Sequence, residues 1–153
     1  MANSDKFQKL TKFVSVKLGS QYFGIPVEHV VDILSPQKTY PIPLAKKEIL
    51  GSINLRGRIV TALDLKYLLG IKIISQNLKT QKCMVLELNG ELFSFVVDEI
   101  GSVINFTLEA LIKTPDTLSP LWQEISLGIF PIEEELAILL DINKTIESLK
   151  NSS

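Results

Sequence analysis

The chain contains an internal duplication, and this feature restricts its fold more than any other. When the sequence is shifted by 70 positions, the apolar alternation of one segment falls on that of another. The residues matched at this shift are Val14 with Met84, Val16 with Leu86, Leu18 with Leu88, Phe23 with Phe93, Ile25 with Phe95, Val27 with Val97, Glu28 with Asp98, Val30 with Ile100, and Ile33 with Val103.

A second match follows at a shift of 77 positions. Its pairs are Leu50-Gly51 with Leu127-Gly128, Leu63-Asp64-Leu65 with Leu140-Asp141-Ile142, and Leu69 with Ile146. Two matches in the same order, each containing a glycine or an acid, predict two copies of one structural unit. The difference between the shifts indicates a longer connection in the second copy, between Phe106 and Ser126.

Both copies show the period-two alternation of half-buried strands. We expect strands at Phe13–Leu18, Tyr22–Ile25, Ile49–Leu55, Arg58–Leu63, Cys83–Leu88, Glu91–Val97, Leu127–Ile132 and Leu136–Asp141. Asn89-Gly90 gives the strongest hairpin signal, because both residues tolerate the positive φ of a type I′ turn. Short helices are expected at Val27–Val31, Asp64–Leu69 and Ile142–Lys150, with Asp64 and Asn143 as N-terminal caps.

Many short strands separated by regular turns are typical of closed barrels, so the chain is predicted to be mainly β. We expect a flexible N-terminal tail over residues 1–12 and a single domain over residues 13–150. Within this domain, residues 13–74 would form a first barrel lobe and residues 75–81 a connector. Residues 82–150 would form a second lobe that ends in a helix.

Composition excludes several classes of function. The formal net charge is −1, with acidic and basic residues interleaved, which argues against a nucleic-acid binder. The segment from Met1 to Lys12 lacks the apolar region of a signal peptide. No apolar run approaches the ~18 residues needed to span a bilayer. We therefore expect a cytoplasmic protein.

Residues suited to catalysis are sparse. Cys83 lies in an apolar run, which favours a buried, inert thiol, and His29 is expected to be a solvated surface residue. One cysteine and one histidine are too few for a zinc site of the usual kind. The equivalent positions of Asp64 and Asp141 in the two copies favour a shared capping role. We expect no enzyme activity, no metal and no cofactor.

Three segments, in order over about residues 13 to 148, resemble the family of CheW, the chemotaxis coupling protein. They are Gly51–Val60 closing on Leu63-Asp64-Leu65, Tyr22–Val27 leading to Val30–Leu34, and Phe95–Ile100 leading to Val103. The chain departs from the family pattern in having Thr61 where proline is usual and Asp32 where glutamate is usual.

The resemblance implies two five-stranded β-barrels that share an apolar seam, with short helices and a C-terminal helix. It also implies a non-catalytic adaptor in chemotaxis signalling. Its partners would be the cytoplasmic tips of methyl-accepting transmembrane chemoreceptors and the regulatory domain of the histidine kinase CheA. Such a protein would be recruited from the cytoplasm to receptor arrays without entering the membrane.

The resemblance also assigns a receptor-binding groove, to Val14, Val27, Val30, Ile33, Ile100 and Val103. The sequence supports this in part, since Val27, Val30 and Val31 recur at helical spacing and apolar grooves commonly accept a helix. The alternative is that these residues fill the core between the lobes.

Four further residues are candidates for partner contacts. By the resemblance, Asp32 and Arg56 form a charged pair beside the groove; the alternative is an ordinary surface ion pair contributing ~0–1 kcal/mol. Leu118 and Trp122 lie in the longer loop of the second copy and are candidates for contacting the kinase. Trp122 is equally suited to covering the open end of a barrel.

Two other functions remain open on sequence alone. One is an adaptor of the same fold in another receptor–kinase array, such as one that controls surface motility. The other is a barrel that binds a small ligand, which a ligand screen by thermal shift would reveal because specific binding raises the apparent stability.

Overall fold

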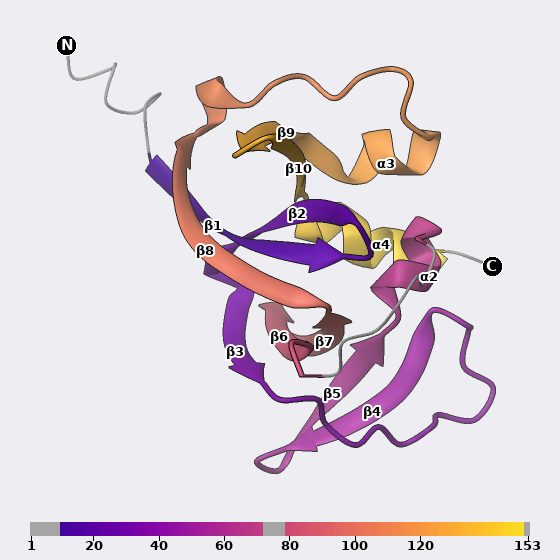
Figure 1. Cartoon of the computed structure of the whole chain (residues 1–153). Coiled ribbons are helices and arrows are strands. Elements are labelled where there is room, and N and C mark those ends of the chain that lie inside the picture. The colour runs from indigo at the N-terminus through magenta and orange to yellow at the C-terminus, as the bar shows by residue number, and fades with distance from the viewer. Residues whose placement is uncertain (1–9, 72–78, 152–153) are drawn as a thin grey trace.

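The computed structural model describes residues 10–71 and 79–151 of the chain (Figure 1). These residues form two five-stranded sheets, with short helices in the connections and at the end of the described chain. The strands are β1 (Leu10–Leu18), β2 (Gln21–Pro26), β3 (Val30–Leu34), β4 (Ile49–Leu55), β5 (Arg58–Leu63), β6 (Lys82–Leu88), β7 (Glu91–Val97), β8 (Glu99–Thr107), β9 (Ser126–Ile132) and β10 (Glu135–Leu140). The helices are η1 (Val27–His29), α2 (Leu65–Leu69), η2 (Leu108–Ala110), α3 (Pro120–Ile125) and α4 (Ile142–Asn151). Among the described residues, no helix combines the length and the apolar character needed to cross a membrane.

The sheets exchange strands between the two copies. One sheet has the order β8-β1-β2-β10-β9 and the other β3-β6-β7-β5-β4. Each sheet thus combines the first two strands of one copy with the last three of the other. The expected division of the strands into lobes at 13–74 and 82–150 is therefore wrong. The exchange depends on two parallel pairings, β2 with β10 and β5 with β7, between strands distant in sequence.

Strand register confirms the duplication. Val16 pairs with Phe23 in the hairpin β1–β2, and the residues 70 positions later, Leu86 and Phe93, pair in the hairpin β6–β7. In the parallel pairs, Phe23 lies opposite Ile138 and Phe93 opposite Thr61. Thr61 and Ile138 are separated by the second shift of 77, so the two sheets repeat one pairing scheme.

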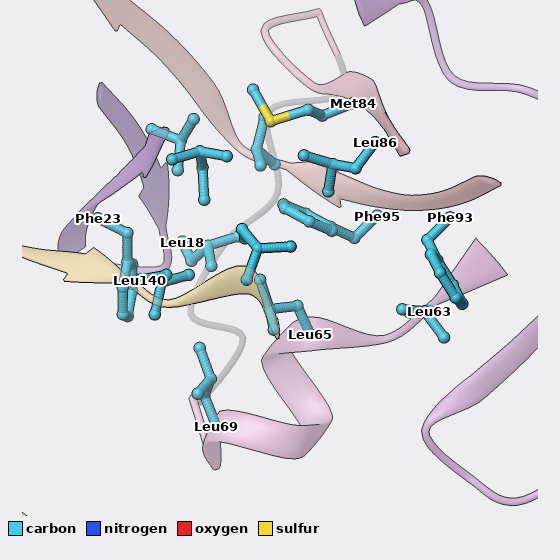
Figure 2. Close-up of a cluster of buried hydrophobic side chains, with 14 of the residues drawn as sticks. Leu18, Phe23, Leu63, Leu65, Leu69, Met84, Leu86, Phe93, Phe95 and Leu140 are labelled. Carbon is cyan, nitrogen blue, oxygen red and sulfur yellow. The ribbon is translucent and has the colours of Figure 1, made fainter. Parts of the chain in front are cut away.

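Apolar side chains form three clusters. The largest lies between the sheets and includes Phe23, Leu140, Met84, Phe93 and Leu63, which Figure 2 shows converging from strands of both sheets. Each sheet also curls around a small cluster of its own. One is made by Phe13, Phe106 and Leu139, and the other by Ile53, Val60, Ala62, Cys83, Val85 and Leu92. The expected apolar seam between two β lobes is therefore present.

The sheets are curled but are not closed barrels, which corrects one part of the expected fold. In the described residues β8 and β9 are the edges of one sheet, and β3 and β4 are the edges of the other. The loop before β4 covers part of its edge through a bridge between Tyr40 and Ser52, and Ile112 bridges to Ile129 of β9 in the same way. Within the part of the chain that the structure describes, no such bridge covers the outer edge of β3 or β8.

The eight expected strands are found, but two others were missed. Residues 27–31, predicted as a helix, form only the single turn η1 before β3 begins at Val30, so the helical spacing inferred there is wrong. The strand β8 was not predicted, and neither was α3. Residues 10–12, expected in a flexible tail, belong to β1, which begins at Leu10. The remainder of that predicted tail, and residues 75–78 of the predicted connector, lie outside the described residues.

The helix caps follow the duplication. Asp64 accepts a hydrogen bond from the backbone N–H of Tyr67 at 3.0 Å, and Asp141 accepts one from Lys144 at 3.1 Å. The shared capping role expected for these two aspartates is confirmed. Asn143, expected to cap α4, instead lies inside the helix, because Asp141 occupies the capping position.

Candidate protein-binding groove

The predicted groove residues lie mainly on the two edge strands β3 and β8, which occupy equivalent positions in the two copies. Opposite residues of an antiparallel pair point to the same side of a sheet. Val30 lies opposite Leu86 and Ile33 opposite Met84, and both partners belong to the cluster between the sheets. Val30 and Ile33 therefore project toward the other sheet.

The same argument places the residues of β8. Ile100 lies opposite Val16 and Val103 opposite Val14, and both partners again belong to the cluster between the sheets. A bulge in the β1–β8 pair allows Ile100 and Val103, three positions apart, to share a face. The structure therefore brings the predicted residues of β3 and β8 to the margin of one apolar cluster.

Burial separates these residues into two kinds. Val14 is only 4% exposed and belongs to the core, whereas Val27, Val30 and Ile100 are half-buried and pack on it. Ile33 is 39% exposed and Val103 56%. Val14 thus has the core-filling role that was the alternative, and Ile33 and Val103 present the accessible apolar surface.

An ion pair joins β3 to the tip of the β4–β5 hairpin. The Arg56 guanidinium lies 3.6 Å from the Asp32 carboxylate, with the arginine side chain 80% exposed. Arg56 has φ +52° and Gly57 φ +83°, so the tip of the β4–β5 hairpin has the backbone of a type I′ turn. Asn54 accepts a hydrogen bond from the Gly57 N–H at 3.0 Å. The two charged residues singled out in the sequence therefore form an ion pair.

Sequence reasoning missed a second, less exposed ion pair. Asp98, in the link from β7 to β8, pairs with Lys66 of α2, and their side chains are 17% and 11% exposed. Asp98 also accepts a hydrogen bond from the Gly19 N–H at 2.7 Å, and Gln81 approaches it at 3.5 Å. The only available signal was the match of Asp98 to Glu28 in the duplication, which does not identify Lys66.

These contacts control the charge of Asp98. Burial raises its pKa, but the hydrogen bonds from Lys66 and Gly19 and the charge of Lys66 outweigh that effect, so the pKa lies below its ordinary value of 3.8. Asp98 also donates its backbone N–H to the Lys17 carbonyl at 2.9 Å. Asp98 directly precedes β8 and lies two residues before Ile100. Its contacts therefore connect the start of β8 to the β1–β2 hairpin and to α2.

The candidate kinase contacts Leu118 and Trp122 both pack against the cluster between the sheets. Trp122 lies on α3, where its indole N–H donates to the Leu69 carbonyl at 3.0 Å and its ring lies 5.6 Å from that of Phe23. This packing assigns Trp122 a covering role at one end of the core. A kinase contact through its remaining surface stays a prediction.

The residues considered for catalysis are not brought together. Cys83 is buried, as expected, and burial raises the pKa of its thiol despite an opposing effect of Ser94. His29 is 19% exposed at its side chain, so it is partly covered by its neighbours rather than solvated as expected. Within residues 10–71 and 79–151, no three His, Cys, Asp or Glu side chains are grouped so as to hold a metal ion.

Comparison with known proteins finds relatives over most of the chain. The chain is 28% identical over 136 residues to the chemotaxis protein CheW of Thermotoga maritima, covering 89% of this chain and 87% of that protein. It is 24% identical over 121 residues to Protein PilI of Pseudomonas aeruginosa, covering 79% of this chain and 67% of that protein.

The fold is also found in a solved structure. The crystal structure of the scaffolding protein TtCheW from Thermoanaerobacter tengcongensis superimposes with a TM-score of 0.77 at 24% identity, covering 88% of this chain and 86% of that one. A family model for the CheW-like domain matches residues 12–150. The chain is therefore a member of the CheW-like domain family, a family of non-catalytic adaptor proteins of chemotaxis.

Proposed function

We propose that this protein couples transmembrane chemoreceptors to the histidine kinase CheA, acting on the cytoplasmic side of the membrane at receptor arrays. The carrying observation is the accessible apolar face presented by the edge strands β3 and β8 at the margin of the core between the sheets, where Ile33 and Val103 are exposed. Membership of the CheW-like family supports the adaptor role, and this face gives it a surface for one partner.

The receptor tip is the partner that fits this face. An amphipathic helix binds by laying its apolar side in such a groove. Val27, Val30 and Ile100 are half-buried against the core and would form the floor of such a groove, and the exposed Ile33 and Val103 would form its walls. The kinase then binds elsewhere on the outer surfaces of the two sheets, because a bridge requires footprints that do not overlap.

The test is a binding measurement on Val103→Asp with a purified receptor-tip fragment. A carboxylate at this position would be buried without a partner when the helix docks, so the affinity should fall at least about tenfold. Val103 is already 56% exposed, so the fold should be retained. Binding to purified CheA should be unchanged.

The matched control is Leu127→Asp, which places the same charge on an exposed apolar position of β9, the opposite edge strand of the same sheet. Receptor affinity should not change in this variant. Equal losses of receptor binding in the two variants, with circular dichroism showing both folded, would show that the groove is not the receptor site.

A further inference from the structure

The two copies differ at the two ends of the core between the sheets. At one end, Trp122 of α3 lies over Phe23 and donates its indole N–H to the Leu69 carbonyl at 3.0 Å. Phe23 and Leu140 are fully buried there. Figure 2 shows Phe23 beside Leu140 at this end, and their counterparts Phe93 and Leu63 side by side at the other. At the first end, an aromatic ring from a short helix therefore covers the core.

The residues that correspond to Phe23, Leu69 and Trp122 in the other copy lie together at the other end of the core. Phe93 corresponds to Phe23 at the shift of 70, and Ile146 corresponds to Leu69 at the shift of 77. Counting back by the same 77 positions pairs Trp122 with Ala45. Phe93, Ile146 and Ala45 all line one cavity of about 400 Å³, between the loop before β4, strands β5 and β7, and helix α4.

Backbone contacts support the correspondence at position 45. The Asp64 N–H donates to the Glu48 carbonyl and the Asp141 N–H to the Ile125 carbonyl, each at 2.7 Å. The shift of 77 therefore already holds at Glu48, three residues after Ala45. The small side chain of Ala45 stands where the second copy has an indole.

Leu44, next to Ala45, also fails to pack on the core as its counterpart does. Leu121 packs against the cluster between the sheets. Its counterpart Leu44 is fully exposed and has φ +61°, a conformation that leucine rarely adopts. An exposed leucine beside an apolar cavity adds apolar surface at the rim.

We propose that this cavity is a binding site for an aromatic side chain presented on a short amphipathic helix of a partner protein. The chain itself provides the model, since Trp122 on α3 and Leu118, just before the N-cap of that helix, both pack on the core. This site lies outside the groove between β3 and β8 and does not depend on the proposed receptor coupling.

The bound ring should lack a hydrogen-bond donor. Leu69 is the last residue of α2, and its carbonyl accepts the Trp122 N–H. Ile146 lies inside α4, which extends to Asn151, so its carbonyl accepts a hydrogen bond from the next helical turn. A buried N–H left without a partner is costly. The site should therefore prefer a phenyl ring to an indole.

The first experiment titrates the full chain with toluene and, separately, with indole, while methyl NMR signals are followed. Toluene should give saturable shifts at Ile146, Leu149 and Leu63, which line the cavity or its floor. Indole should bind more weakly. Absence of saturable shifts with toluene, or tighter binding of indole, would overturn the proposed chemistry of the site.

The second experiment uses a peptide with the sequence of residues 115–126 in which Trp122 is replaced by Phe. Short isolated helices are marginal in water, so weak binding is expected and NMR is the suitable measurement. Its shifts should coincide with those of toluene. If toluene binds at the cavity but the peptide does not, a partner helix is not the occupant and the proposal fails.

Two variants of the loop before β4 provide the decisive comparison. Ala45→Trp should place an aromatic ring in the cavity from within the chain, raise the melting temperature and weaken peptide binding at least about tenfold. Lys47→Trp adds the same side chain in the same loop, but residue 47 does not line the cavity, so it should change neither quantity. Equal peptide affinity of Ala45→Trp and Lys47→Trp would count against the site.

Thr61→Trp is the second filling variant, because Thr61 lines the cavity from β5, a strand paired on both sides, and not from the loop. It should block the peptide even if the Ala45→Trp ring turns outward. Peptide binding unchanged in both folded variants would overturn the proposal. So would concentration-dependent dimerisation of the wild-type chain that either variant abolishes, because the occupant would then be a second copy.

Discussion

The two copies of the duplicated unit share a framework but carry different surfaces. At the tip of the β4–β5 hairpin, Arg56 forms an ion pair with Asp32 of β3. At the equivalent tip of β9–β10, Glu133 and Ser102 of β8 line a separate cavity of about 400 Å³. The first residue of each tip has a similar positive φ, +52° at Arg56 and +54° at Glu133, whereas the second has a positive φ at Gly57 but not at its counterpart Glu134. The copies therefore share a strand framework but differ in the turn and in the side chains at the hairpin tips.

The largest expected effect tests the shared framework at Gly51 and Gly128, which have φ +148° and +150°. An added Cβ would lie 2.2 Å from the Tyr40 carbonyl oxygen at Gly51, but 3.0 Å or more from its neighbours at Gly128. Gly51→Ala should lose about 3 kcal/mol or more and Gly128→Ala about 1–2 kcal/mol. Urea unfolding measures both; equal losses would mean that the two bridged loops tolerate a side chain alike.

The next comparison is between Asp98 and its counterpart Glu28. Asp98→Asn leaves Lys66 partly buried without its charged partner and should cost about 3 kcal/mol. Glu28 has a side chain that is 72% exposed, so Glu28→Gln should change the free energy of unfolding by no more than about 0.5 kcal/mol. A loss in Asp98→Asn as small as that in Glu28→Gln would show that the ion pair contributes little.

The pH dependence sharpens the same comparison. Because folding lowers the pKa of Asp98 from 3.8, its contribution is fully present above that value and is lost as the pH falls through the lower folded pKa. The stability difference between wild type and Asp98→Asn should therefore shrink between about pH 5 and about pH 2. Urea midpoints across this range measure it, and a difference independent of pH would contradict the assignment.

The smallest expected effect on stability concerns the two hairpin tips. Arg56→Glu should change the free energy of unfolding by about 0.5 kcal/mol or less, because the arginine is mostly exposed. It should nevertheless weaken receptor binding, since it sets two like charges against each other at Asp32, on the strand that carries Val30 and Ile33. Glu133→Arg is the matched change at the other tip. A loss of several kcal/mol in Arg56→Glu would show that the residue is structural.

The sequence predicted the parts of the fold that depend on local pattern. The eight strands with clean alternation were found, and so were the Asn89-Gly90 turn and the repeated aspartate caps. β8 was missed because Gly101, Ser102 and Asn105 interrupt its apolar alternation. The cap of α3 was visible in the sequence, since Ser119 precedes Pro120 at the first helical position, a recognised start signal.

The exchange of strands between the copies could not be predicted from periodicity. It depends on β2 pairing with β10 and β5 with β7, and neither pairing leaves a local signal. For the same reason, the duplication drew attention to Asp98 but did not identify its ion-pair partner Lys66. The groove residues came from the family resemblance. Only the place of each strand in the sheet, with β1 inside and β8 at the edge, separates the buried Val14 from the accessible Val103.

The most direct test of the central claim is whether one molecule holds both partners at once. The receptor-tip fragment is titrated into the protein alone and into the protein saturated with CheA, and the dissociation constant is measured each time. The account predicts equal or tighter receptor binding in the presence of the kinase, together with a ternary complex in sedimentation velocity. Competition between receptor and kinase, with no ternary complex, would contradict the adaptor mechanism.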